Sequence, residues 1–258
     1  MRRLAAILVA AALLCGSWAG TATTTLWDWR LPAWVPPPAL DRPLTVAEVE
    51  LGRWLFHDTR LSRDGTMSCA SCHQQARAFA LNRATAPGVD GSPGDKNPMS
   101  LVNLAWAPVL NWANPAQTSL ERQALIPLFS DHPVEMGMSG REDELFARIA
   151  ADPRYAPMFA AAFPDREGAI TLETLTRALA AFQRAIAGFD SPYDRYRWGG
   201  QRNAISASAK RGERLFFSER LECYHCHGGL LFSDNVMHSR LIAPEMGFHD
   251  TGLSLIHI

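Results

Sequence analysis

Two short stretches of the sequence place cysteine and histidine in a spacing that can support redox chemistry. Both have the pattern Cys-x-x-Cys-His, and their residues are Cys69, Cys72, His73, Cys223, Cys226 and His227. Two thiols on one turn of chain can each form a thioether with a porphyrin vinyl group, and the adjacent imidazole can ligate the iron. We therefore predict two covalently bound haem c groups, with a motif histidine as an axial ligand of each iron.

A pair of Cys-x-x-Cys motifs also fits a zinc site or two redox-active disulfides. Neither alternative requires a histidine directly after the second cysteine, and both copies have one. The chain has five cysteines, and the fifth, Cys15, lies in an apolar N-terminal segment. If that segment is removed, no thiol remains for a structural disulfide, which favours haem attachment.

The N-terminal residues have the pattern of a secretory signal peptide. Two arginines precede an apolar run, Leu4 to Leu14, which is too short to span a bilayer as a helix, and small residues follow it. We predict a signal peptide over residues 1–22 and a periplasmic protein without a stable membrane span. The bulky leucine before Cys15 disfavours a lipid anchor.

The bulk composition is that of a globular protein. The chain has 258 residues, of which 47% are hydrophobic and 20% are charged. Its formal net charge of −1 gives no electrostatic basis for binding nucleic acid.

Helical patterns surround the two haem motifs. Thr45 with Glu48 forms a capping box at the start of one helix, and Thr171 precedes apolar residues that recur at helical spacing. Further helices are predicted to start at Ser139 and Pro153. We predict a mainly α fold class, with long loops and little β structure.

An internal repeat indicates two cytochrome c-like haem domains. Gly52-Arg-Trp-Leu-Phe56 precedes the first haem motif, and Gly212-Glu-Arg-Leu-Phe216 precedes the second. The predicted segments after the signal peptide are a Pro/Trp-rich arm (23–44), an N-terminal domain (45–198), the start of a C-terminal domain (199–252) and a non-native tail (253–258).

Two stretches are predicted to lack regular structure. Gln74 to Glu135 is rich in Gly, Pro and Asn, and structureless loops of this length are usually functional. Asp190 to Gly200 has the composition of a linker into the second domain. Beyond Gly252 we expect the natural sequence to differ, because no helix follows that closes the far side of the second haem.

Six further strings carry a resemblance to a known family. They are Glu50-Leu-Gly-Arg, Ser71-Cys-His-Gln-Gln, Ser100-Leu-Val-Asn, Leu110-Asn-Trp-Ala-Asn, Pro133-Val-Glu-Met and Phe217-Ser-Glu-Arg-Leu-Glu-Cys. From Thr45 to Gly252 the sequence resembles the bacterial di-haem cytochrome c peroxidase and MauG family. Within that family it is most similar to the MauG-like branch typified by MbnH.

The resemblance implies different roles for the two haems. The N-terminal haem, ligated by His73, would react with hydrogen peroxide. The C-terminal haem, ligated by His227, would store or pass electrons. The enzyme class implied is a peroxidase-type haem oxidoreductase.

The resemblance also places Gln123, Pro127 and Glu135 over the peroxide-reactive iron. A carboxylate there can move a proton between the two oxygens of peroxide, and an amide can hold peroxide by hydrogen bonds. The alternative is that Gln123 and Glu135 are ordinary polar loop residues. Classical members also supply a distal histidine, but Gln74 to Asp131 contains none. We therefore expect a five-coordinate iron, with His132 as the alternative ligand.

Two more residues match family positions between the haems. Trp112 matches a tryptophan that relays electrons, although most tryptophans are simply core residues. Asn97 matches a ligand of a bound calcium ion, whose other ligands lie in a segment that this sequence lacks.

The predicted function is a periplasmic oxidoreductase that uses hydrogen peroxide to oxidise a partner protein, typically at a Trp side chain. One alternative is a peroxidase that detoxifies peroxide with electrons from a small redox protein. Another is a di-haem electron-transfer protein without chemistry of its own.

Overall fold

The computed structural model describes residues 24–94, 96–112 and 114–243. The predicted signal peptide and the predicted non-native tail lie outside these residues. The α-helices of the described part are α2 (Val46–Phe56), α3 (Cys69–Cys72), α4 (Leu120–Phe129), α5 (Glu142–Ala150), α6 (Tyr155–Ala162), α7 (Leu172–Ala185), α8 (Pro192–Arg197) and α9 (Ala207–Phe216). Short 3-10 turns are η1 (Thr59–Leu61), η2 (Gln75–Arg77), η3 (Leu104–Trp106), η4 (Pro164–Arg166) and η5 (Cys223–His225).

Pairing between extended segments in the described residues is limited to isolated bridges, such as Leu26 with Thr45. The predicted fold class, mainly α with little β structure, is confirmed. None of the helices in the described part of the chain is long and apolar enough to cross a membrane.

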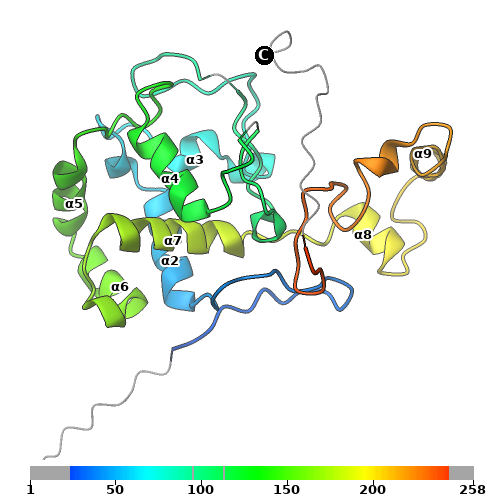
Figure 1. Cartoon of the computed structure of the whole chain (residues 1–258), viewed down its shortest axis with the longest axis horizontal. Coiled ribbons are helices and arrows are strands. Elements are labelled where there is room, and N and C mark those ends of the chain that lie inside the picture. The colour runs from blue at the N-terminus through cyan, green and yellow to red at the C-terminus, as the bar shows by residue number, and fades with distance from the viewer. Residues whose placement is uncertain (1–23, 95, 113, 244–258) are drawn as a thin grey trace, which may run out of the picture.

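Helices α2 and α7 cross at the centre of the larger lobe, which Figure 1 shows together with α3 to α6. Both begin where the sequence predicts. Thr45 and Glu48 form the expected capping box, and Thr171 caps α7 through the backbone N–H of Thr174. The core between them is apolar and fully buried, with Leu51, Leu55, Phe56, Leu175, Ala178 and Leu179 among its members.

Gly52 permits this close crossing. A Cβ at this position would lie 1.8 Å from the carbonyl oxygen of Ala178 on α7. Gly212 occupies the equivalent place in the sequence repeat, on α9. A Cβ there would meet nothing within 4 Å among the described residues.

Gly52→Ala is therefore expected to lower the free energy of unfolding by about 3 kcal/mol, because α2 and α7 must separate to admit the methyl group. Gly212→Ala is the matched control. It is expected to raise stability by up to about 1 kcal/mol, since alanine favours a helix interior. Urea unfolding of both variants measures the difference, and equal effects would contradict the proposed role of the close approach.

Two helices begin later than predicted. Helix α5 begins at Glu142 rather than near Ser139, whose hydroxyl instead donates to the carboxylate of Asp131. Helix α6 begins at Tyr155, two residues after Pro153, because Asp152 turns back to accept a hydrogen bond from the backbone N–H of Arg154.

Two stretches predicted to lack regular structure each contain a helix. Helix α4 lies inside the long predicted loop, where Pro127 interrupts the helical pattern of the sequence. Helix α8 lies inside the predicted linker, with Ser191 as its cap and Pro192 in its first turn, a position that proline favours. The Gly and Pro content of both stretches predicted loops rather than helices.

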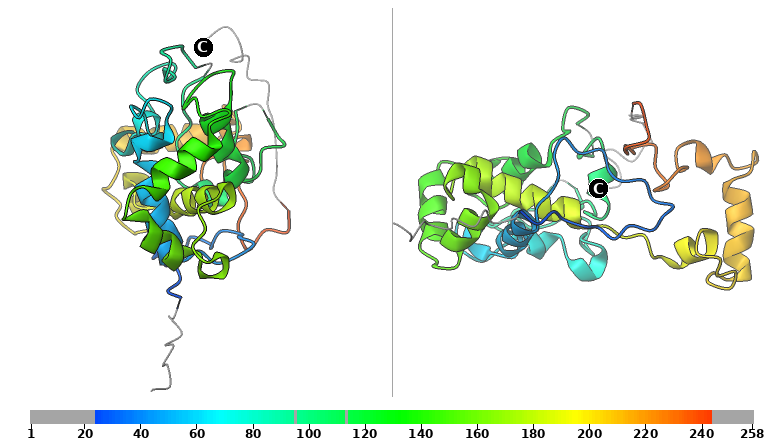
Figure 2. Two further views of the ribbon diagram at one scale, coloured as in Figure 1. Left: turned by 90° about the vertical axis from the view of Figure 1, so that its left-hand side faces the viewer. Right: turned by 90° about the horizontal axis from the view of Figure 1, so that it is seen from below.

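The second, smaller lobe contains α8, α9 and η5, and an extended stretch after α7 leads to it (Figure 2). Tyr193 of α8 donates a hydrogen bond to Glu213 of α9 at 3.0 Å. The arm, predicted as an extended segment on the domain surface, runs between the lobes, and its Val35 and Leu44 are buried. Its Pro36 carbonyl accepts a hydrogen bond from Trp106 Nε1, and its Pro37 carbonyl accepts one from the N–H of Ser239.

Candidate haem sites

The first Cys-x-x-Cys-His motif forms the short helix α3, which follows α2 and η1. The backbone N–H of Ser68, just before the helix, donates to the Ser71 hydroxyl at 3.0 Å and so fixes the start of the turn. One helical turn places Cys69 and Cys72 on the same side of the chain. Their free thiols stand for the two thioether sulfurs of the haem-attached protein.

His73 is held in the orientation that an iron ligand requires. Its Nδ1 lies 2.9 Å from the carbonyl oxygen of Phe79, so an N–H at Nδ1 donates there and Nε2 is left to bind a metal. Burial lowers the pKa of His73, although hydrogen bonds to the carbonyls of Phe79 and Met99 oppose this. Burial therefore favours the neutral side chain, which is the form that ligates iron.

The second motif repeats this arrangement. Cys223 begins the 3-10 turn η5, and His227 Nδ1 lies 3.2 Å from the carbonyl oxygen of Phe232. Phe79 and Phe232 both have a left-handed backbone, with φ of 57° and 56°. This conformation is uncommon for a bulky residue, and at both sites it belongs to the residue whose carbonyl accepts from the motif histidine.

Sequence reasoning missed these two phenylalanines. The available signal was a Phe six residues after His73 and another five residues after His227. Their contribution is made by a backbone carbonyl, so the side-chain type gives little indication of it.

The residues present fit two haem groups. At each site a pair of unbridged thiols lies beside a histidine whose Nδ1 is already hydrogen-bonded. The second lobe also exposes apolar side chains around its motif, as a large flat apolar group would require, and they are Leu215, Phe217, Leu221 and Phe232.

Helix α4 carries Gln123 and Pro127 one turn apart, on the same face. Proline has no backbone N–H, so the carbonyl of Gln123 loses the helical hydrogen bond it would otherwise accept from this residue. The side-chain Oε1 of Gln123 is buried and has no hydrogen-bond partner among the described residues. A buried acceptor of this kind is costly unless something donates to it, so it is suited to a ligand that carries an O–H.

Glu135 is brought to the same helix by backbone hydrogen bonds. The N–H of Met136 donates to the carbonyl of Pro127 at 2.9 Å, and the carbonyl of Glu135 accepts from Val89 at 2.8 Å. Burial raises the pKa of the Glu135 carboxyl. Its charge also adds to the effect of burial in raising the pKa values of the Cys69 and Cys72 thiols.

The structure therefore places Glu135 near the first pair of thiols and joins its segment to the helix that bears Gln123 and Pro127. A carboxylate and an amide acceptor that face the same small protic ligand can hold it and move its proton. His132, the alternative ligand, is exposed beyond the end of α4.

Trp112 and Asn97 are connected by a hydrogen bond. Trp112 Nε1 donates to the backbone carbonyl of Asn97 at 2.9 Å, and Asn97 Nδ2 donates to the carbonyl of Leu81 at 2.9 Å. The side-chain amide of Asn97 thus connects two parts of the loop that follows the first haem motif. The relay role of Trp112 and the calcium role of Asn97 stay predictions.

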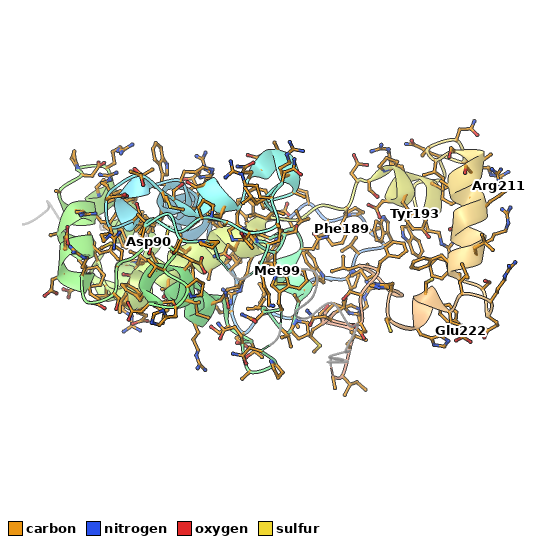
Figure 3. The ribbon with its side chains drawn as sticks, turned by 90° about the horizontal axis from the view of Figure 1, so that it is seen from above. Asp90, Met99, Phe189, Tyr193, Arg211 and Glu222 are labelled. Carbon is orange, nitrogen blue, oxygen red and sulfur yellow. The ribbon has the colours of Figure 1, made fainter. Side chains whose placement is uncertain are left out.

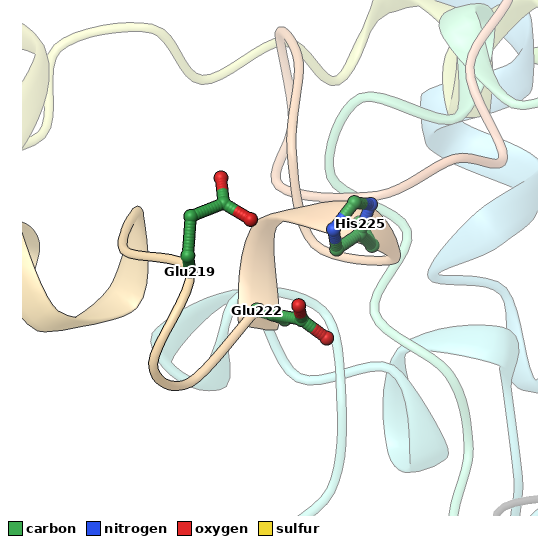
Figure 4. A group of neighbouring side chains, drawn as sticks. All are labelled: Glu219, Glu222 and His225. Carbon is green, nitrogen blue, oxygen red and sulfur yellow. The ribbon is translucent and has the colours of Figure 1, made fainter.

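Figure 4 shows an exposed group at the second motif, formed by Glu219 and Glu222, which precede the motif, and His225, which lies inside it. Their candidate ligand atoms lie within 4.8 Å of one another. Glu219 already accepts a hydrogen bond from the hydroxyl of Tyr224 at 2.8 Å. Exposed acidic groups of this kind are common without a metal, so we assign the cluster no role.

Comparison with known proteins places this geometry in a family. The family model described as di-haem cytochrome c peroxidase matches residues 46–203. The chain belongs to the di-haem cytochrome c peroxidase family. Two c-type haems are the cofactors of the family, and this chain carries an attachment motif for each.

Individual relatives come from both branches of the family. The methylamine utilization protein MauG of Methylorubrum extorquens is 38% identical over 225 residues, which cover 87% of this chain and 58% of MauG. The cytochrome c peroxidase Ccp of Escherichia coli is 33% identical over 197 residues, which cover 76% of this chain and 40% of Ccp. The chain thus spans about three fifths of the first relative and less of the second.

A solved structure is also similar. The crystal structure of a MauG-like protein associated with microbial copper homeostasis superposes with a TM-score of 0.83 at 44% identity, covering 88% of this chain and 65% of that protein. Its similarity extends to both lobes, which is consistent with two cytochrome c-like domains.

Proposed function

We propose that the protein is a periplasmic di-haem oxidoreductase that reacts with hydrogen peroxide at the haem of Cys69 and Cys72. Electrons would reach that site through the haem of Cys223 and Cys226. The observation that carries the proposal is the buried, unpartnered Oε1 of Gln123, on the helix to which the Glu135 segment is hydrogen-bonded.

When bound, the haem supplies an iron centre that peroxide can oxidise. The protein residues bind the substrate and move its proton. Gln123 Oε1 accepts a hydrogen bond from a peroxide O–H, which satisfies its buried acceptor. Glu135 takes the proton that one peroxide oxygen loses and returns it to the other, so that the O–O bond can break with water as the leaving group.

We further propose that the electrons come from a side chain of a partner protein, typically a tryptophan. Two observations support this choice over a soluble donor. The residues from Gln74 to Asp131 contain no histidine to block the iron, and the similar proteins include MauG and a MauG-like structure. The second candidate is peroxide detoxification with a small redox protein as donor, which the similarity to Ccp supports.

The visible spectrum of the ferric holoprotein tests the proposal. We expect one high-spin haem whose absorption shifts within seconds of adding equimolar peroxide, and one low-spin haem. Two low-spin haems that are indifferent to peroxide would instead identify an electron-transfer protein. Adding a reduced small redox protein afterwards distinguishes the two candidate functions, because only a peroxidase would oxidise it in repeated turnovers.

A further inference from the structure

Four aromatic side chains form a continuous contact path, which we call the aromatic stack: Trp106, Phe189, Trp34 and Trp198. Trp106 meets Phe189 edge to face with ring centroids 4.9 Å apart, and Phe189 meets Trp34 edge to face at 5.8 Å. Trp34 and Trp198 are stacked nearly parallel, with centroids 5.3 Å apart and planes 15° apart. The four residues come from η3, the stretch after α7, the arm and the end of α8.

The aromatic stack leads from the interior to the surface. Trp106 is 0% exposed, whereas Trp198 is 52% exposed. Figure 3 shows Phe189 between the two lobes, with Tyr193 of α8 beyond it. Three segments distant in sequence are therefore held together by one line of rings.

Its buried end is fixed beside the loop that follows the second haem motif. The carbonyl of Trp106 accepts a hydrogen bond of 2.7 Å from the N–H of Met237, ten residues after His227. Asn103 Nδ2 donates to the carbonyl of Gly188 at 3.1 Å, which holds η3 against the stretch that carries Phe189. Such fixed contacts favour electron transfer between neighbouring rings, because little rearrangement accompanies each step.

Indole is among the most easily oxidised side chains, and two stacked indoles share a positive charge better than one. We propose that the aromatic stack conducts oxidising equivalents from the interior to Trp198, and that Trp198 is oxidatively modified when no donor protein is bound. The inference rests on the proposed function, since peroxide is the oxidant.

The chemistry balances with two electrons. Hydrogen peroxide takes up two electrons and two protons and gives two molecules of water. The indole of Trp198 loses two electrons and two protons while gaining an oxygen atom from water, which its exposure admits. The sum is tryptophan plus hydrogen peroxide giving hydroxytryptophan plus water.

Trp54 provides a matched comparison within the same chain. It is 42% exposed, and the guanidinium of Arg154 lies 4.9 Å from its ring centroid. Trp198 is similarly exposed, and the guanidinium of Arg197 lies 5.0 Å from its ring centroid. A cation over the ring makes each indole harder to oxidise to the same degree. Trp198 stacks on the ring of Trp34, whereas Trp54 makes no contact with another aromatic ring among the described residues.

The experiment adds peroxide to the holoprotein without a donor and maps added oxygen atoms by peptide mass spectrometry. We expect modification of Trp198 to exceed that of Trp54 about tenfold. Diffusing peroxide reaches both side chains alike, so a difference of this size would come from the aromatic stack. Each factor of ten corresponds to about 1.4 kcal/mol in the barrier. Equal modification of the two residues would overturn the proposal.

Two substitutions test the path itself. Trp34→Phe keeps a ring in the stack but makes it harder to oxidise, and Phe189→Leu removes the ring between the tryptophans. Each is expected to lower modification of Trp198 about tenfold. Modification of Trp54 and the rate of peroxide consumption are expected to stay unchanged. Arg197→Gln is expected to raise modification of Trp198 about fivefold, by removing the cation from its ring.

The outcomes separate the two proposals. If peroxide is consumed but Trp198 is unmodified, the path is overturned and the proposed function stands. If Trp34→Phe and Phe189→Leu both leave modification of Trp198 unchanged with melting temperatures near wild type, the path is likewise overturned. If no peroxide is consumed, the proposed function fails and the path, which depends on this oxidant, fails with it.

Discussion

Glu135→Gln is expected to slow the reaction of the holoprotein with hydrogen peroxide by about 10²-fold or more, the usual loss when a positioned proton-transfer group is removed. The amide keeps the size and hydrogen-bonding capacity of the side chain but cannot take up the peroxide proton. Haem content is expected to be unchanged, because Glu135 contributes no atom to haem attachment. Stopped-flow absorption at the high-spin band measures the rate.

The pH dependence of this rate provides a sharper test. Burial raises the pKa of Glu135, so the carboxyl is protonated over a higher range of pH than usual. Proton uptake requires the ionised form. The wild-type rate should therefore fall as the pH is lowered through this raised pKa, and the Gln variant should show no such fall.

Asp143→Asn is the control for this variant, since Asp143 is exposed on α5. It should leave the rate and its pH profile unchanged. A Glu135→Gln variant with a wild-type rate would refute the assignment of Glu135, although the family membership of the chain would still hold.

Asp58→Asn is expected to lower the free energy of unfolding by about 3 kcal/mol, the low end for removing one partner of a buried ion pair. Asp58 accepts hydrogen bonds from Arg60 Nε at 2.8 Å and from the hydroxyl of Tyr155, and it is buried where η1 meets α6. The low end applies because Arg60 is partly exposed and keeps a second partner, Asp152, at 2.6 Å.

The effect of this substitution also depends on pH in a known direction. Burial alone would raise the pKa of Asp58, but hydrogen bonds from Arg60 and Tyr155 outweigh it and lower the pKa. The stabilisation is thus present above the unfolded pKa, about 3.9, and is lost as the pH falls through the lower folded value. Urea unfolding should show the full difference at pH 7 and a shrinking difference below about pH 4.

Asp165→Asn is the control for the stability measurement. Asp165 is exposed and its nearest cation, Arg166, lies 3.7 Å away. The change should stay within about 0.5 kcal/mol. If Asp58→Asn were equally mild, Asp58 would not be a structural ion-pair partner.

The features predictable from the sequence are those that depend on neighbours along the chain. The caps at Thr45 and Thr171 are local hydrogen bonds, and both helices begin there. The haem motifs are local as well. Helix α4 was not predicted because Pro127 interrupts the helical pattern of its sequence, although the helix accommodates the proline.

Contacts between segments that are distant along the chain could not be predicted from the sequence. The approach of Glu135 to the first motif depends on a bond between the backbones of Met136 and Pro127, and backbone bonds leave no mark on residue type. The same holds for the carbonyls of Phe79 and Phe232, which orient the two motif histidines. Family resemblance named Gln123, Pro127 and Glu135 as candidate distal residues, and the structure shows the backbone hydrogen bonds that hold the Glu135 segment against α4.

The arm has a consequence for the order of folding. Its Pro37 is hydrogen-bonded to Ser239, so the contact closes a loop of about 200 residues. Closing a long loop carries an entropic cost that grows with the logarithm of its length, and contacts of such large sequence separation form slowly. Contacts of shorter sequence separation within each lobe can form first. We therefore expect the arm to dock last, so that the aromatic stack, which includes Trp34, is completed late in folding.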